Sequence, residues 1–209
     1  GIDPIILEPK EGLSLINGTQ VSTAIAIKAC LEAENVLKVA DLSGAISVEA
    51  SLSSRSVFKS DIHKLKNHPG QRIVASNIWN LLDKSEIVLS HKNCDRLQDP
   101  YSFRCIPQVH GISRENYKCA KEIVENEANS VSDNPLIMPN GKILNSGHFH
   151  AESIAQAMDN LSIAIAEIGS IAERRIHYFM KGIGDNVPPF IASNPGLESG
   201  FMTAHVTAA

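Results

Sequence analysis

The sequence predicts a mainly α-helical protein built from long helices. Its 209 residues are 43% hydrophobic and 20% charged, a balance that suits one substantial core. Aromatic residues make up only 5%, and small and aliphatic residues are plentiful. Small side chains let helices approach closely, whereas a β-sandwich normally recruits more aromatic and β-branched residues. We therefore expect a long-helix bundle.

Charge and cysteine content argue against several classes of protein. The net charge is −4 and no basic cluster stands out, so neither a nucleic-acid partner nor a membrane partner is expected. No apolar run reaches the length of a membrane span. Cys30, Cys94, Cys105 and Cys119 show neither metal-site spacing nor a dense disulfide framework. They predict reduced thiols in a cytoplasmic protein.

Two helical segments are predicted after an asparagine-containing turn. Residues 1–11 hold two prolines and suggest a connector from something earlier in the chain. Asn17 is placed to cap the helix expected from Gln20 to Leu37, which a second segment follows from Val39 to Ala50. Apolar residues cover more than one face of both segments, as in helices buried in a bundle or an oligomer. Asn17 is also able to donate and accept hydrogen bonds with a ligand.

The next part of the chain is mixed in character. Residues 51–69 are polar and predict a loop or an exposed helix end that includes His63. A helix is expected over residues 70–82, with Trp79 assigned to packing. Residues 83–95 predict no clear element.

Gln98 to Arg104 reads Gln-Asp-Pro-Tyr-Ser-Phe-Arg and has the composition of a functional site. If Pro100 opens a helical turn, Tyr101 and Arg104 project from one face. Arg104 is then able to hold a carboxylate through two parallel hydrogen bonds, beside the Tyr101 phenol. The alternative is a capped helix start whose arginine pairs with Asp95 or Asp99 at the surface.

The second half predicts two helices around a hairpin, and then a third helix. A helix capped by Ser113 is expected to Asn129, with Tyr117, Ile123 and Val124 on its inner side. Turn-forming residues in 130–145 separate two short apolar runs and predict a hairpin. The longest helix is expected over residues 151–180, and a last one begins at residue 201.

Histidines precede the longest helix in an alternating pattern. His148, His150 and Glu152 would share one face of a strand and bind zinc there, as in a metal hydrolase. On a helix, the two histidines point about 200° apart and do not converge on one ion. Because strongly helical residues follow, no metal site is expected here, and helix capping or packing explains these histidines.

Five segments of the chain resemble, in the same order, the middle of histidine ammonia-lyases, members of the aromatic amino acid lyase family. They are Leu15–Gln20, Gln98–Gln108, Ser132–Leu136, Gly147–Glu152 and Ala166–Arg175. Related phenylalanine and tyrosine ammonia-lyases share the Gln-Asp-x-Tyr-x-x-Arg core. Pro100, Cys105 and the Phe-His-Ala-Glu that begins at Phe149 look like the histidine branch. The resemblance implies that residues 1–209 are one helical segment, the central core of a longer enzyme truncated at both ends.

The resemblance also implies roles for individual residues. Arg104 would hold the substrate α-carboxylate, and Tyr101 would act as the catalytic residue near the cofactor and the amino group. Asn17 would also hydrogen-bond near the cofactor and the amino group, and Gln98 would support that network. Phe149 would form a wall of the substrate pocket.

The reaction that the resemblance implies is loss of ammonia from L-histidine to give trans-urocanate, in a homotetramer. The family uses methylidene-imidazolone (MIO), an electrophile made from an internal Ala-Ser-Gly, to help remove a weakly acidic proton. This chain has no Ala-Ser-Gly, so we expect it to be inactive by itself.

Two other functions remain open. A non-catalytic helical oligomerisation module would keep the apolar helix faces without needing Gln98, Tyr101 and Arg104 together. An ammonia-lyase for another aromatic amino acid is the other possibility. His148 stands where the family usually has asparagine, and an imidazole there changes the polarity of the pocket, so the ring specificity stays open.

Overall fold

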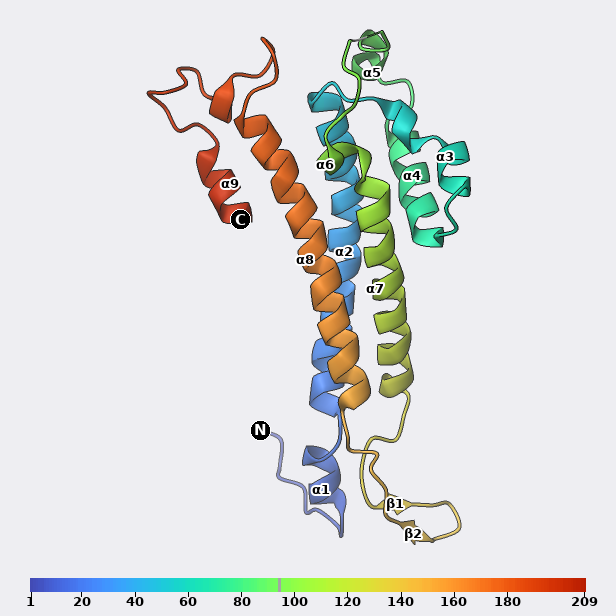
Figure 1. The fold of residues 1–209 in the computed structure, drawn as a ribbon. Coiled ribbons are helices and arrows are strands. Elements are labelled where there is room, and N and C mark those ends of the chain that lie inside the picture. Colours follow the sequence, from blue (N-terminus) through green and yellow to red (C-terminus); the bar gives the residue numbers. More distant parts are fainter. Residues whose placement is uncertain (94) are drawn as a thin grey trace. The chain divides into compact units, whose positions relative to one another are not determined.

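The computed structural model describes residues 1–93 and 95–209 and confirms a mainly helical chain (Figure 1). These residues form two compact units, one made of 1–32 and 118–161 and the other of 33–117 and 162–209. Three long helices contribute to both units: α2 (Gln20–Ala50), α7 (Ile106–Ala128) and α8 (Glu152–Met180). None of the described helices combines the length and apolarity that crossing a bilayer requires. That the chain is one helical segment stays a prediction.

The first unit joins the helix ends to a small hairpin. It contains α1 (Glu11–Ile16), the start of α2, the end of α7 and the start of α8. Strands β1 (Leu136–Ile137) and β2 (Ile143–Leu144) pair antiparallel, with Leu136 opposite Leu144. The predicted hairpin is therefore confirmed.

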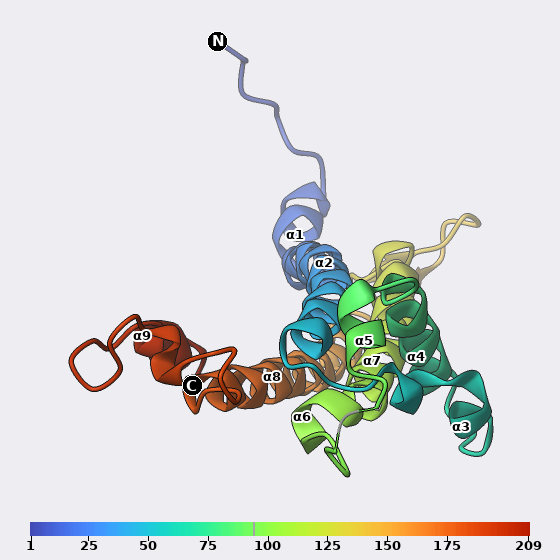
Figure 2. The same cartoon turned by 90° about the horizontal axis from the view of Figure 1, so that it is seen from above.

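The second unit holds the larger core and the shorter helices. These are η1 (Arg55–Phe58), α3 (Ser60–Lys64), α4 (Pro69–Leu81), α5 (Glu86–Ser90), α6 (Tyr101–Arg104), η2 (Pro189–Ile191) and α9 (Met202–Ala208). Both views show α3 beside α4 (Figure 2). The buried core consists of Ala45, Val48, Phe58, Val74, Ile78, Leu82, Phe103, Ile106 and Ile171.

Two predictions about helix boundaries were wrong. The region predicted as two helical segments is one continuous helix, because Lys38 and its neighbours include no proline and no cap that would end it. Helix α7 begins at Ile106 rather than at Ser113, since Pro107 is favoured in a first helical turn. Ser113 instead donates its hydroxyl to the carbonyl oxygens of Val109 and Ala164.

His63 is buried rather than exposed. Its ring accepts a hydrogen bond from Gln71 Nε2 at Nδ1, 2.9 Å away, and its Nε2 lies 2.9 Å from the carbonyl oxygen of Val57. Both ring nitrogens are therefore satisfied, which removes most of the cost of burying the imidazole.

Helices α4 and α7 approach so closely that glycine is required at their contact. A Cβ on Gly111 would lie 2.4 Å from the backbone nitrogen of Gln71, and one on Gly70 would lie 2.1 Å from the carbonyl oxygen of Gly111. Neither backbone is able to move aside as a flexible side chain would.

We expect Gly111→Ala to destabilise the fold by about 1–3 kcal/mol, the usual cost of overpacking. Gly169→Ala in α8 is the matched control, because among the described residues no atom outside the nearby backbone of its own helix lies within 4 Å of its added Cβ. That control should be stabilising by about 0.5–1 kcal/mol, because alanine is the better helix former. Urea unfolding measures both changes, and equal effects of the two substitutions would contradict the close contact.

Candidate functional site

The short helix α6 carries the two chemically active side chains that the sequence predicted to share a face. Pro100 precedes it with a φ of −56°, which suits the entry to a helical turn. The central carbon of the Arg104 guanidinium lies 4.5 Å from the centroid of the Tyr101 ring. The prediction that Tyr101 and Arg104 lie together is therefore confirmed, and their stacking is a cation–π contact.

The remaining residues of this stretch hold the turn in place. Asp99 is buried and accepts hydrogen bonds from the backbone N–H of Ser54 at 2.8 Å and from Arg96 at 3.1 Å. Phe103 is buried, and its ring packs edge-on to Tyr178 with centroids 5.1 Å apart. The turn thus points its structural side chains inward and leaves Tyr101 exposed.

Arg104 has no internal anion in the part of the chain that the structure describes. Asp99, one partner that the sequence suggested, pairs with Arg96, and no described ion pair joins Arg104 to Asp95. The Nε atom of Arg104 is buried without a hydrogen-bond partner among the described residues. A buried, unpaired donor of a guanidinium is costly, and a carboxylate ligand would satisfy it.

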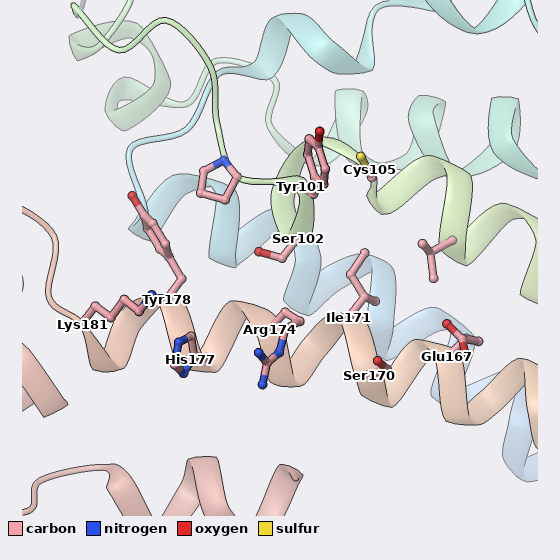
Figure 3. A pocket seen from close by; sticks show the side chains of 12 residues that line it. Tyr101, Ser102, Cys105, Glu167, Ser170, Ile171, Arg174, His177, Tyr178 and Lys181 are labelled. Carbon is pink, nitrogen blue, oxygen red and sulfur yellow. The ribbon is translucent and has the colours of Figure 1, made fainter.

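Tyr101 lines a cavity of about 540 Å³ in the second unit (Figure 3). Tyr101 and Cys105 stand on one wall, and Glu167, Arg174 and His177 come from α8. Partial burial and the nearby cations Lys181 and Arg174 lower the pKa of His177. The wall from α8 therefore offers a neutral imidazole and a fixed positive charge.

Arg175 ends the last of the five segments and is a residue of this region to which the sequence analysis gave no role. It is 3% exposed, and its Nη1 lies 3.4 Å from the carbonyl oxygen of Ser102 in α6. Burial lowers the pKa of Arg175 to about 10. The side chain therefore supports the turn that carries Tyr101 and Arg104 rather than forming a surface pair. The only signal in the sequence was an arginine on the apolar side of a long helix.

Gln98 lies in the segment before α6 and is exposed. It belongs to the second unit with Tyr101 and Arg104, whereas Asn17 and Phe149 belong to the first unit and are described there.

Asn17 is fixed by an aspartate from another of the five segments. Its Nδ2 donates to Asp133 at 2.7 Å, and Lys10 and Ser14 bind the same carboxylate. Hydrogen bonds from Lys10, the backbone N–H of Asn134 and Asn17 hold the pKa of Asp133 well below its usual range. The Asn17 amide oxygen accepts no hydrogen bond from a described residue, so this atom remains available to a ligand.

Gly18 allows this approach of the two segments. Its φ is +98°, and a Cβ there would lie 2.0 Å from the carbonyl oxygen of Ser132. Any other residue would separate Asn17 from Asp133.

The residues before α8 do not form the alternating histidine site. His150 Nδ1 accepts a hydrogen bond from the backbone N–H of Glu152 at 3.3 Å, so His150 caps the helix as expected. Phe149 and His148 are exposed in the turn that precedes it. Phe149 is therefore placed to present its ring to a ligand or to further protein.

Three of the four cysteines lie within the described residues. Cys30, Cys105 and Cys119 are free thiols, as predicted, and burial raises the pKa of Cys30. Cys94 lies outside the described residues.

Comparisons with known proteins agree on one family. The family model described as "Aromatic amino acid lyase" matches residues 1–209. The chain is 50% identical to the histidine ammonia-lyase of Vibrio cholerae, covering 100% of this chain and 41% of that protein. It thus spans about two-fifths of the length of the curated relatives it matches.

Solved structures give the same result for the fold. The histidine ammonia-lyase of Trypanosoma cruzi superposes with a TM-score of 0.88 at 41% identity, over 99% of this chain and 38% of that one. A tyrosine aminomutase of Streptomyces globisporus superposes with a TM-score of 0.89 at 32% identity, over 99% of this chain and 43% of that one.

Proposed function

The chain belongs to the aromatic amino acid lyase family, and from that premise we propose that the full-length protein is a histidine ammonia-lyase. It would convert L-histidine to trans-urocanate and ammonia. The identity of 50% to a histidine ammonia-lyase, against 32% to a tyrosine aminomutase, supports the histidine branch. The structural observation that carries the proposal is the buried Nε of Arg104, which has no hydrogen-bond partner among the described residues, beside Tyr101.

Arg104 binds the α-carboxylate of the substrate in this proposal. A carboxylate is planar and takes two parallel hydrogen bonds from a guanidinium. The internal alternative, pairing with Asp99, is occupied by Arg96. An amino acid substrate would therefore bring the anion that Arg104 lacks among the described residues.

Tyr101 is the proposed catalytic residue, and three others complete the binding site. Tyr101 is 71% exposed, and its phenol is assigned to hydrogen bonding around the substrate amino group. Asn17, whose amide oxygen accepts no hydrogen bond from a described residue, and Gln98 are assigned by the family resemblance to the network around the substrate. Phe149 would cover the substrate ring and exclude water, which strengthens polar contacts.

The family's electrophile, methylidene-imidazolone, fits this set of residues. A buried unpaired Nε on Arg104 and a buried unpaired Oε1 on Gln108 in the same segment leave polar atoms that suit a polar ligand. Asn17 and Tyr101 would hold the group by hydrogen bonds. When bound, it would withdraw electron density from the substrate and make the β-proton more acidic. This chain contains no Ala-Ser-Gly from which to form it, so we propose that the 209 residues alone are inactive.

The exposed apolar side chains of α2 support assembly into a homotetramer. Val21, Ile25, Val39 and Ile46 are each more than half exposed, which is an unusual density for one helix facing water. Burial against further protein would remove this surface, and light scattering of the full-length protein measures the number of subunits. A cytoplasmic location, predicted from the free cysteines, belongs to the same proposal.

The proposal is tested on the full-length protein with L-histidine, L-tyrosine and L-phenylalanine offered separately. We expect urocanate absorbance from L-histidine only, together with an intact mass two waters below that of the translated sequence. Product from another amino acid would move the protein to a different branch of the family, and a β-amino acid product would indicate an aminomutase. An unmodified mass without product would contradict the lyase assignment.

A further inference from the structure

A carboxylate and two imidazoles converge in the second unit, between α8 and α9. Glu173 and His177 lie four residues apart on α8, so they project from one face of the helix. His205 comes from α9, which both views place beside the C-terminal part of α8 (Figure 2). The His205 Nε2 lies 2.5 Å from Glu173 Oε1, and the His177 and His205 ring centroids are 5.2 Å apart.

We propose that Glu173, His177 and His205 form a binding site for a divalent metal ion of the zinc class. Their three ligand atoms all lie within 4.8 Å of one another. A zinc ion bound by nitrogen and oxygen at about 2.0–2.2 Å needs ligand atoms about 3.3–3.5 Å apart, so small side-chain rotations complete the site. This site shares His177 with the cavity that Tyr101 lines, and its test measures metal content rather than lyase activity.

The donor set selects the class of metal. Two imidazole nitrogens and one carboxylate oxygen suit zinc and its neighbours among the transition metals, whereas magnesium and calcium prefer oxygen ligands alone. Three protein ligands leave a fourth tetrahedral position for water. Glu173 is buried and His177 and His205 are half-buried, so the ion would be only partly shielded from solvent.

Arg174 is the competitor for the metal. Its guanidinium holds both carboxylate oxygens of Glu173, and Arg174 itself is exposed. A bound cation would take one of these oxygens, and Arg174 is able to turn outward into water. In Figure 3, Arg174 and His177 lie on neighbouring turns of α8. Removing the arginine should therefore strengthen metal binding at this site. Metal bound nonspecifically to a surface histidine would not respond to this substitution.

Metal binding would also join α9 to α8, because His205 is the ligand that α9 contributes. The described contacts that join the two helices at this point are the hydrogen bond from His205 to Glu173 and the contact between the His177 and His205 rings. Amide hydrogen exchange of residues 202–208 should therefore slow when zinc is added.

The test is equilibrium dialysis of the full-length protein with zinc chloride, with metal content measured by mass spectrometry. We expect one zinc per chain, and His205→Gln and His177→Gln each to weaken binding by at least about 100-fold, since loss of outer-shell partners alone costs about 10–100-fold. Arg174→Gln should tighten binding by up to about fivefold, the usual worth of an exposed ion pair.

His68→Gln is the matched control, because His68 is exposed and belongs to no such group among the described residues. Circular dichroism of each variant establishes that its helices remain. Absence of zinc from the wild-type protein overturns the proposal. Zinc binding that persists in both the His177 and His205 variants also overturns it, since the metal then lies elsewhere.

Discussion

Replacing Arg104 by methionine in the full-length protein should lower kcat/KM for L-histidine by at least about 30-fold. The guanidinium has a buried Nε without a partner among the described residues, and the substrate carboxylate is its proposed anion. Losing one member of a buried, hydrogen-bonded charge pair costs about 2–5 kcal/mol, and about 1.4 kcal/mol corresponds to tenfold in rate. Steady-state formation of urocanate measures the change.

L-histidinamide separates carboxylate binding from a structural role of Arg104. This analogue has no α-carboxylate, so the wild-type protein should prefer L-histidine to it, and Arg104→Met should lose most of that preference. An equal loss for both substrates would show that Arg104 acts through the fold. Arg72→Met is the control, because Arg72 is exposed on α4 and its side chain forms no described ion pair.

The long helices and the paired site residues were predictable because local sequence determines them. Helix α8 begins within one residue of its predicted start, since an uninterrupted run of helix formers follows His150. Tyr101 and Arg104 fall on one face because three residues make nearly one helical turn. Pro100 before the turn is a local signal for the start of a helix, so no distant contact is needed to predict it.

Two of the errors arose where distant residues decide the structure. Gly111 weakens the local helix signal at the start of α7, although Pro107 suits a first helical turn. Its backbone is helical because Gly111 lies against Gln71 of α4, a contact that the local pattern does not contain. His63 looked exposed for the same reason, since Gln71 satisfies its ring in the folded chain.

The buried ionic network around Asp41 was not predicted at all. Its partners Asn77, His110 and Arg114 lie 36, 69 and 73 residues away in sequence. Asp41 is one of four carboxylates in α2, so the sequence does not show that this one is buried, although a buried carboxylate is rarely left unpaired. Sequence alone does not identify the partner.

Asp41→Asn should therefore destabilise the fold by about 3–5 kcal/mol, the usual cost of breaking a buried ion pair. Asp41 is 3% exposed and accepts hydrogen bonds from Asn77 at 2.8 Å, from His110 at 3.0 Å and from Arg114 at 2.6 Å. Burial by itself raises the pKa of Asp41, but the hydrogen bonds from His110 and Asn77 and the charge of Arg114 lower it overall. Urea unfolding of the chain measures the loss.

The exposed pair of Asp83 with Arg55 provides the matched control for that substitution. The Asp83 side chain is 58% exposed, so Asp83→Asn should cost less than about 1 kcal/mol. Similar losses for Asp41→Asn and Asp83→Asn would contradict a special role of the buried network.

The same network determines whether the folding stability rises or falls with pH. Burial lowers the pKa of His110, and the hydrogen bond to Asp41 only partly opposes this effect. An unfolded histidine takes up a proton below about pH 6.5, while the buried His110 remains neutral, so the unfolded state binds more protons. The stability that this histidine contributes is therefore complete above about pH 6.5 and is lost as the pH falls toward its folded pKa. His110→Gln should lower stability at pH 7.5 and flatten its decline between about pH 6.5 and 5. The unfolding free energy is measured by urea unfolding at each pH. If it depends on pH in the same way in His110→Gln and in the wild type, His110 titrates as freely in the folded chain as in the unfolded chain.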